Sequence, residues 1–492
     1  MENEFKIKMG LEIHQQLEGN RKLFCNCPPI LRKDKPDFEV KRKIHAVAGE
    51  SGEIDIATKY EFGKDKEFIY QGYDTTCLVE LDEEPPHLIN QEALQIALHI
   101  SLLLNCEIFP ITQIMRKTVI NGSNTSGFQR TVFIARDGYV ETKFGKVGII
   151  GVFLEEDAAR PASVEEQDDL ELENFKIYKL DRLGIPLVEI VTSPDIKSAE
   201  QAKEIALYIG DVLRSCNVKR GIGTIRQDIN VSIEGHPRIE IKGFQDPKMM
   251  IKTVELEIER QKQNLILLSK DNNLLKNELK SEVRNANIDG TTSFLRPMPG
   301  AARMYPETDL PLLRIKKEII DEAKKTLPKL RSEIRGELTK KGLHEDQVKI
   351  LLKNKKLEDF ESLLNIINDP KFIFKVLIEI PKEIARHENI ENIDEKITLD
   401  IIDSILDYVK ENKIEKQDIK HIIEEIAKGK SFEDAIKLEK IDLVDIESEI
   451  MKIVKEKPGL SIGGYMGLIM GKFKGKVSGK EVTEILQKLI SK

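Results

Sequence analysis

A carboxylate and an imidazole lie close together near the start of the chain. Glu12 and His14 fall within residues 5–17 (FKIKMGLEIHQQL), where apolar and polar residues alternate without a break. This alternation predicts a β-strand with one buried face and places Glu12 and His14 side by side on the other face. Gly10, on the same face, leaves room for a ligand to approach the backbone. Such a pair can form half of a site for Mg²⁺ or Mn²⁺, although a solvated sheet face would show the same alternation.

Three consecutive carboxylates end an apolar stretch in residues 147–157 (VGIIGVFLEED). We expect a strand here, with Glu155, Glu156 and Asp157 at its end. Like charges this close are costly unless a cation offsets them, so the cluster favours a metal site, and Arg160 is a candidate partner for one carboxylate. An acidic surface turn is the alternative.

A single carboxylate interrupts a second apolar stretch. Glu189 lies in the middle of residues 186–191 (PLVEIV), a run typical of a strand that is buried on both faces. A buried carboxylate without a partner is costly or takes up a proton, and binding to a metal would remove that cost. The alternative is a glutamate on the exposed face of an edge strand.

A hairpin whose polar face carries both signs of charge is expected over residues 225–243. Its first strand places Arg226 and Asp228 on one face, and its second strand returns with Lys242. Arg226 and Lys242 are candidates to hold phosphate, and Asp228 is a candidate to hold a cation. A salt-bridged solvent face is the alternative.

A loop over residues 120–131 (INGSNTSGFQRT) is dense in Gly, Ser, Thr and Asn, so it presents backbone N–H groups and hydroxyls that suit anions. The chain contains neither G-x-x-x-x-G-K-[ST] nor G-x-G-x-x-G, so a nucleotide would bind by other means. Together these segments indicate a site on an exposed sheet face that depends on Mg²⁺ and phosphate.

Two cysteines follow the first expected strand. Cys25 and Cys27 could supply two ligands to Zn²⁺, but a closed structural site needs four. Cys77, Cys106 and Cys216 form no second close pair in the sequence, so small buried thiols are the favoured interpretation.

The composition is that of an ordinary soluble globular protein, with 40% hydrophobic and 33% charged residues among 492. The net charge of −8 excludes a chain that is basic overall, although a local basic patch stays open. We expect no signal peptide and no membrane-spanning segment. The odd number of dispersed cysteines fits a reducing compartment, so we expect a cytoplasmic protein.

The pattern of the chain predicts an α+β protein with a mostly antiparallel sheet in residues 1–310. Helical spacing of apolar residues then predicts an all-α domain over 311–410 and a small α-helical tail over 411–492. Within the first domain we expect helices at 90–105, capped by Asn90, at 198–216, capped by Ser198, and from 247 to about 280.

The tail is locally basic, with six Lys against two Glu between Gly471 and Lys492. A solvated helix is the usual interpretation of such a segment. Phosphate contact is the alternative, and the lysines concerned are Lys472, Lys474, Lys476 and Lys480.

Long ordered motifs resemble the E subunit of archaeal glutamyl-tRNA(Gln) amidotransferases, in the family that also contains the bacterial B subunit. They are MGLEIHQQL, KLFCNCPP, CLVELDEEPPH, RKTVINGSNTSGFQRT, LEEDAAR, LDRLGIPLVEIVTSPDI and RPMPGAARMYPETDLP. GGYMGLIMGKFKGKVSGKEV resembles the tail domain of the family, so the resemblance covers nearly the whole chain. It implies a cradle-shaped catalytic domain, a helical domain and a tail that contacts the body of the tRNA, which favours the phosphate-contact interpretation of the tail lysines.

The resemblance implies conversion of Glu-tRNA(Gln) to Gln-tRNA(Gln). ATP and Mg²⁺ would phosphorylate the γ-carboxylate of the tRNA-bound glutamate, and ammonia would then displace phosphate. The ammonia would come from an asparaginase-like amidase of the D type, in a heterotetramer of two D and two E subunits.

The family carries metal ligands in three motifs, G-L-E-x-H, E-E-D-A and P-L-x-E-I. They correspond here to Glu12, His14, Glu156 and Glu189, which we take as the catalytic and metal-binding residues. We add Glu155, Asp157 and Asp228 as further metal ligands or acids of the phosphate site. From charge and position alone, the candidates for contacts with phosphate or the acyl acceptor are Arg130, Arg182, Arg226 and Lys242.

One departure from the family is plain. Archaeal E subunits commonly carry an inserted domain like one in aspartyl-tRNA synthetases, whereas here only about 45 residues, expected to be helical, separate Phe244 from Thr291. Three other hypotheses stay open: a B-type subunit that works with an A-type amidase, a tRNA-binding scaffold without catalysis, and a metal-dependent phosphodiesterase.

Overall fold

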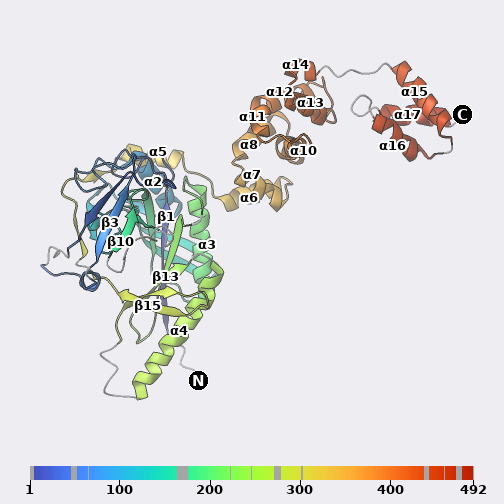
Figure 1. The fold of residues 1–492 in the computed structure, drawn as a ribbon. Helices are drawn as coiled ribbons and strands as arrows, with labels where there is room; N and C mark the ends of the chain where they lie inside the picture. The colour runs from blue at the N-terminus through green and yellow to red at the C-terminus, as the bar shows by residue number, and fades with distance from the viewer. Residues whose placement is uncertain are drawn as a thin grey trace. The chain divides into compact units, whose positions relative to one another are not determined.

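The computed structural model describes residues 5–490, except 46–51, 65, 163–174, 222, 245–246, 271–278, 301–302, 437–442, 459 and 473–478. The chain divides into two compact units, Met1–Ser332 and Glu333–Lys492, which are described separately (Figure 1). None of the described helices is long and apolar enough to cross a membrane.

An eleven-stranded sheet forms the framework of the first unit, with strand order β15-β14-β13-β12-β1-β11-β8-β7-β6-β16 and β4 paired to β7. All of its pairs are antiparallel except β13 with β14, so the expected mostly antiparallel sheet is confirmed. Its strands are β1 (Ile7–Gln16), β4 (Glu107–Ile108), β6 (Ile114–Thr118), β7 (Phe128–Thr142), β8 (Gly145–Glu156), β11 (Pro186–Thr192), β12 (Ile225–Ile233), β13 (Ile239–Phe244), β14 (Glu282–Ala286), β15 (Thr292–Pro297) and β16 (Met304–Pro306).

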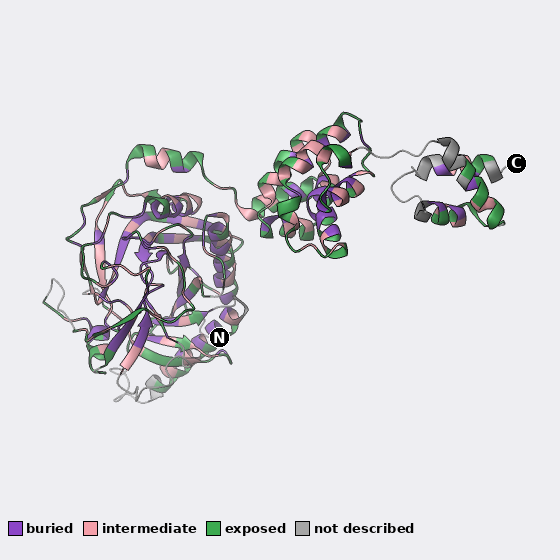
Figure 2. Ribbon diagram, turned by 45° about the horizontal axis from the view of Figure 1, so that its top comes forward, coloured by how far each residue is buried: buried purple, intermediate pink, exposed green. Residues whose placement is uncertain are grey.

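The apolar face of the large sheet packs against helices and forms the main core (Figure 2). Met9, Leu11 and Ile13 of β1 are at most 1% exposed there, as the alternation in β1 requires. The covering helices are α2 (Gln91–Leu103), α3 (Ala199–Ser215) and α4 (Pro247–Lys270), with α5 (Lys317–Lys325) packed beside α2. The polar face of the sheet is thereby left for the site.

Two of the expected helices begin where their caps predict. The Asn90 side chain accepts hydrogen bonds from the second and third backbone N–H groups of α2, and Ser198 caps α3 in the same way. The third expectation is wrong at its end, because α4 stops at Lys270 and residues 282–286 form strand β14. The parallel pairing of β14 with β13 accounts for the difference, since tertiary pairing overrides helical spacing there.

A smaller sheet of order β2-β3-β10-β9 holds the loop over residues 121–127 in place. The hydroxyl of Tyr70 donates to the carbonyl of Gly122 at 2.8 Å, and that of Tyr178 donates to the carbonyl of Asn121 at 2.9 Å. The elements of this region are β2 (Phe38–Arg42), α1 (Ile56–Phe62), β3 (Glu67–Gly72), β9 (Arg160–Pro161), β10 (Phe175–Lys179) and the separate pair β5 (Ile111–Thr112) and β17 (Leu313–Arg314).

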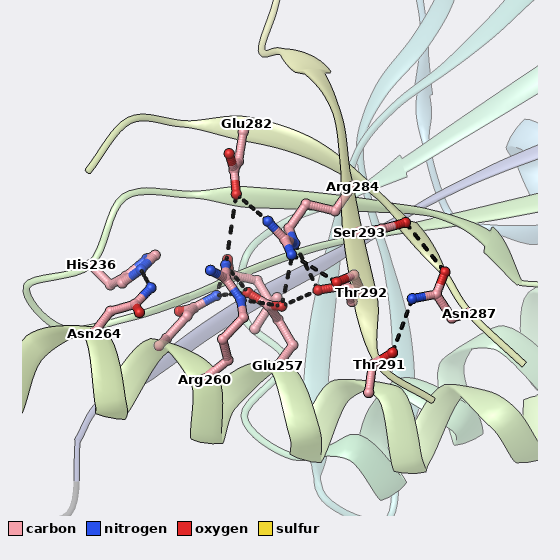
Figure 3. Close-up of polar contacts among 12 residues, drawn as sticks. His236, Glu257, Arg260, Asn264, Glu282, Arg284, Asn287, Thr291, Thr292 and Ser293 are labelled. Carbon is pink, nitrogen blue, oxygen red and sulfur yellow. Dashed lines mark hydrogen bonds and ion pairs between the residues drawn. The ribbon is translucent and has the colours of Figure 1, made fainter. Parts of the chain in front are cut away.

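A buried glutamate fastens α4 to the end of the large sheet (Figure 3). The Glu257 side chain is fully buried and accepts hydrogen bonds from Arg260 at 2.7 and 2.9 Å and from the Thr292 hydroxyl at 2.7 Å. Arg284 of β14 donates to both the hydroxyl and the carbonyl of Thr292 at 2.7 Å. Strand β15 is therefore held by charged hydrogen bonds from two neighbouring elements.

The second unit is helical, as expected, and has its own apolar core. Its described elements are α6 (Arg331–Lys340), α7 (Glu345–Lys353), α8 (Leu357–Ile366), α9 (Pro370–Phe374), a π-helical turn (Lys375–Glu379), α10 (Ile380–His387), α11 (Ile393–Lys396), α12 (Leu399–Lys410), α13 (Ile419–Ala427), α14 (Phe432–Ala435), α15 (Leu443–Glu456), α16 (Ile462–Lys472) and α17 (Gly479–Ile490). The last three share a separate small core around Ile450, Tyr465 and Leu486.

Candidate active site

The register of the large sheet brings polar residues from distant segments onto one face. On β1, Glu12 lies opposite Asp228 of β12, and His14 lies opposite Glu189 of β11. Glu155 follows on β8, the next strand. Directly opposed residues of antiparallel strands share a face and lie close enough to interact. β11 is an interior strand between β1 and β8, so the edge-strand alternative for Glu189 is wrong.

His14 lies at the centre of this face. Its Nε2 atom is 3.6 Å from Glu12 Oε1 and 3.6 Å from Glu189 Oε2. The ligand atoms of Glu12, His14 and Asp228 all lie within 4.8 Å of one another, and so do those of His14, Glu155 and Glu189. Carboxylate oxygens with one imidazole nitrogen match the ligands of hard divalent cations such as Mg²⁺ and Mn²⁺.

Two lysines partly offset the carboxylates. Lys117 Nζ of β6 lies 2.7 Å from Glu155 and 3.3 Å from Glu189. Lys242 Nζ of β13 lies 2.5 Å from Asp228 and 2.6 Å from Glu240. These two lysines face five carboxylates in all, so the face retains a negative excess that a divalent cation would neutralise.

The acidity of these groups reflects their crowding. Burial and the charge of Glu189 raise the pKa of Glu12 to about 7. Burial and Glu189 also raise the pKa of Glu155. Burial acts against the charged forms of His14 and Glu189, yet their hydrogen bond and mutual charge raise the pKa of His14, and Lys117 helps to hold the pKa of Glu189 well below its usual range.

Glu156 points to the opposite face of β8 from Glu155. Its carboxylate lies 3.5 Å from Arg130, whose Nε donates to the buried Glu307 at 2.8 Å. Within the described residues, neither Glu156 nor Arg130 belongs to the groups that meet at His14. The sequence could have indicated this, because neighbouring residues of a strand face opposite ways.

Asp157 forms a second polar centre beside the first. Its carboxylate accepts from Gln16 at 2.6 Å and from Arg226 at 3.0 Å. Arg182 donates to the carbonyls of residues 158 and 159 at 2.7 and 3.0 Å. Arg160, the expected partner of the acidic cluster, instead pairs with Asp181 at 2.8 Å, since residues 158 and 159 carry it past the strand end. The buried cluster also excludes an acidic surface turn.

A cavity of about 530 Å³, here called the main cavity, opens over this face. It brings together most of the predicted site residues, namely Glu12, His14, Glu155, Asp157, Arg182, Arg226, Asp228 and Lys242. Asn121, Ser123 and Asn124 of the predicted anion loop line it as well. Sequence analysis missed Lys117 and Arg303, which also line it. Their only signal was a place inside the long motifs at 116–131 and 296–311.

Gly10 has a different role from the expected one. A Cβ atom at this position would lie 3.2 Å from the Thr192 carbonyl oxygen, so the neighbouring chain approaches the backbone here. Close packing of β1 against the end of β11, rather than ligand access, accounts for the glycine.

Three cysteines gather away from the main cavity. The ligand atoms of Cys25, Cys27, Cys77 and Glu80 lie within 4.8 Å of one another. Cys77 therefore joins the first pair, which its distance in sequence had argued against. Three thiols and a carboxylate match the number of ligands in a structural zinc site, while Glu80 also pairs with the buried Lys22. Zinc and simple buried thiols both stay open.

The predicted tRNA contacts of the tail lie largely beyond description. Lys474 and Lys476 fall outside the described residues, and only the backbone is described for Lys472, at the end of α16, and for Lys480, in α17. Their contact with tRNA stays a prediction.

A sheet face that gathers carboxylates, a histidine and lysines in one cavity is typical of a metal-dependent enzyme that acts on phosphate-bearing substrates. The chain belongs to the GatB/GatE family: the family profile described as the GatB/GatE catalytic domain matches residues 7–321. It is similar to the E subunits of the glutamyl-tRNA(Gln) amidotransferases of Methanocaldococcus jannaschii (37% identity over 98% of each chain) and of Pyrobaculum arsenaticum (34% over 98% of each).

The alignment to the Methanocaldococcus protein extends over 628 residues, against 492 in this chain. At least 136 positions of that alignment thus have no counterpart here. This difference agrees with the expected absence of an inserted domain.

Proposed function

We propose that this chain is the catalytic subunit of a glutamyl-tRNA(Gln) amidotransferase, a ligase that converts Glu-tRNA(Gln) to Gln-tRNA(Gln) with ATP. The observation that carries the proposal is the convergence of Glu12, His14, Glu155, Glu189 and Asp228 from four adjacent strands, within the part of the chain that matches the family's catalytic domain.

The reaction requires two successive substitutions. An oxygen of the γ-carboxylate forms a bond to the γ-phosphorus of ATP, and ADP leaves. The nitrogen of ammonia then forms a bond to the acyl carbon, inorganic phosphate leaves, and the nitrogen gives up a proton to give the neutral amide. The first step is needed because a carboxylate is a poor electrophile.

The residues of the main cavity divide this work by charge. Glu12, His14 and Asp228, together with Glu155 and Glu189, would hold Mg²⁺. Bound there, the ion would neutralise the charge of the phosphates. Lys117 and Lys242 keep the carboxylates ionised and oriented through their ion pairs. Arg182 and Arg226, at the Asp157 side of the cavity, would contact the anionic substrates.

Three finer statements belong to the same proposal. The ammonia comes from an asparaginase-like D-type amidase, in a complex of two D and two E subunits. The tail lysines contact the tRNA, and the complex works in the cytoplasm. The names of the relatives and the length of the match support these statements.

An amidation assay tests the proposal. Purified chain with ATP, Mg²⁺, ammonium chloride and tRNA(Gln) carrying labelled glutamate should yield labelled glutaminyl-tRNA with matching ADP release. Glu189→Gln should lose at least about 100-fold in rate, in line with removal of a group that acts in the transition state. Glu107→Gln, an exposed glutamate of β4, is the matched control and should keep full rate.

The outcomes separate the alternatives. Failure to form glutamine or phosphorylated glutamate, even with an asparaginase-type partner, would leave the scaffold hypothesis. Release of nucleotides from RNA without ATP would indicate a phosphodiesterase. Activity only with an A-type amidase would indicate a B-type subunit.

A further inference from the structure

Three cavities of the first unit meet at one arginine. Besides the main cavity, a cavity of about 330 Å³ adjoins Glu12, Lys117 and Glu189, and a third of about 340 Å³ adjoins α1 and Asn121. Arg303 lines all three, and Arg296 lines the second and third. These two guanidinium groups thus lie where the cavities join.

The two arginines differ from the neighbouring lysines in their acidic partners. Within the part of the chain that the structure describes, neither arginine has a carboxylate oxygen within 4.0 Å, whereas Lys117 and Lys242 each have two. The Arg296 guanidinium donates to the carbonyl of Pro297 at 3.3 Å. Burial and the charge of Arg303 lower the pKa of Arg296, although Glu240 acts in the opposite direction. Two like charges near one another in a cavity favour a bound anion.

The fold places both arginines close to the acidic face. Arg296 lies on β15, which the Glu257 and Arg284 hydrogen bonds hold in place (Figure 3). Arg303 directly precedes Met304 of β16, which pairs with Lys117 of β6. Strands β15 and β16 are the two ends of the large sheet, so its edges bring one arginine each to the same cavities.

We propose that Arg296 and Arg303 form a guanidinium pair that binds the polyphosphate of ATP opposite the acidic sheet face. A planar guanidinium presents paired N–H donors that match phosphate oxygens. The tRNA-bound glutamate has only one free carboxylate, the reacting one, so it does not require two additional cations. The joined cavities are also of the size that nucleotide ligands occupy. This inference rests on the proposed function.

Nucleotide binding by the full chain tests the inference. Equilibrium dialysis with labelled ATP, Mg²⁺ and tRNA(Gln) would compare the wild type with Arg296→Gln and Arg303→Gln. Each substitution should weaken ATP at least about tenfold, as expected for loss of a charge-assisted hydrogen bond. ADP should be weakened less if the γ-phosphate is contacted, and adenosine should bind as before. Arg303→Lys, which keeps the charge but not the fork, should fall between wild type and Arg303→Gln.

The controls separate the inference from the proposed function. Arg136→Gln, on the exposed side of β7, should leave ATP affinity unchanged. Unchanged ATP affinity in both test variants, or an equal loss for adenosine, would overturn the inference alone. Weakened binding of tRNA with intact ATP affinity would also overturn it and assign the pair to a tRNA phosphate. A wild-type chain that binds no ATP would refute the proposed function itself.

Discussion

Lys117 supports the acidic face, so its removal should loosen the centre of the sheet. Its Nζ lies 2.7 Å from Glu155 and 3.3 Å from Glu189, whose side chains are 1% and 10% exposed. Breaking a buried ion pair on one side costs ~3–5 kcal/mol because the remaining charge has no partner. In Lys117→Met, opening of β8 and β11 should therefore become easier by that amount, which accelerates hydrogen exchange roughly 10² to 10³-fold.

Hydrogen–deuterium exchange of peptides from β8 and β11, in metal-free buffer, measures this effect. Arg136→Met is the matched control, because Arg136 is exposed and pairs with Glu107 at 3.4 Å. Such surface pairs contribute about 0–1 kcal/mol, so its exchange should stay near the wild-type rate. Addition of Mg²⁺ should slow exchange in Lys117→Met if the carboxylates bind it. Equal exchange rates in Lys117→Met and the wild type would refute the argument that Lys117 stabilises this face.

Three further predictions concern other parts of the first unit. Gly10→Ala should destabilise β1 by about 1 kcal/mol, because the new methyl would meet the Thr192 carbonyl oxygen at 3.2 Å, and faster exchange of β1 peptides would show it. Burial lowers the pKa of His236 from its usual 6.5, and Nε2 lies 3.4 Å from the Asn264 amide. The unfolded state therefore takes up this proton first, so stability should fall as pH drops below about 6.5, and a flat profile between pH 7 and 5 in exchange of the β12–β13 turn would contradict this. Metal analysis should find about one zinc per chain, lost in Cys77→Ser, if the thiol cluster is a structural site, and no zinc would leave buried thiols.

Local patterns in the sequence sufficed for the strands and for one half of the site. Alternation has a period of two in any strand, so the common face of Glu12 and His14 follows without knowledge of the fold. The same rule could have separated Glu155 from Glu156, which the family motif instead placed together. The interpretation of Gly10 failed for another reason, since the approach of Thr192 depends on the tertiary structure.

The other half of the site depends on strand register, which local patterns do not contain. Glu189 and Asp228 flank β1 because β11 and β12 pair with it, although they lie far along the chain. Lys117 reaches Glu155 across β7 only because β6 pairs with that strand. A pairing shifted by one residue would turn these side chains to the core face. Register, rather than residue type, thus limits prediction of the site from sequence.

The charge distribution of the cavities also restricts what can bind them. The carboxylates of Glu12 and Glu189 line one side, and the guanidinium groups of Arg296 and Arg303 line the other. A free polyphosphate would be attracted by the arginines and repelled by the carboxylates, whereas a polyphosphate complexed with a divalent cation matches both. ATP affinity should therefore fall at least about tenfold when Mg²⁺ is removed, the result of exposing an anion to unneutralised carboxylates. In Glu12→Gln this dependence should weaken, because the variant removes one of the repelling charges, and an unchanged dependence would place the nucleotide elsewhere.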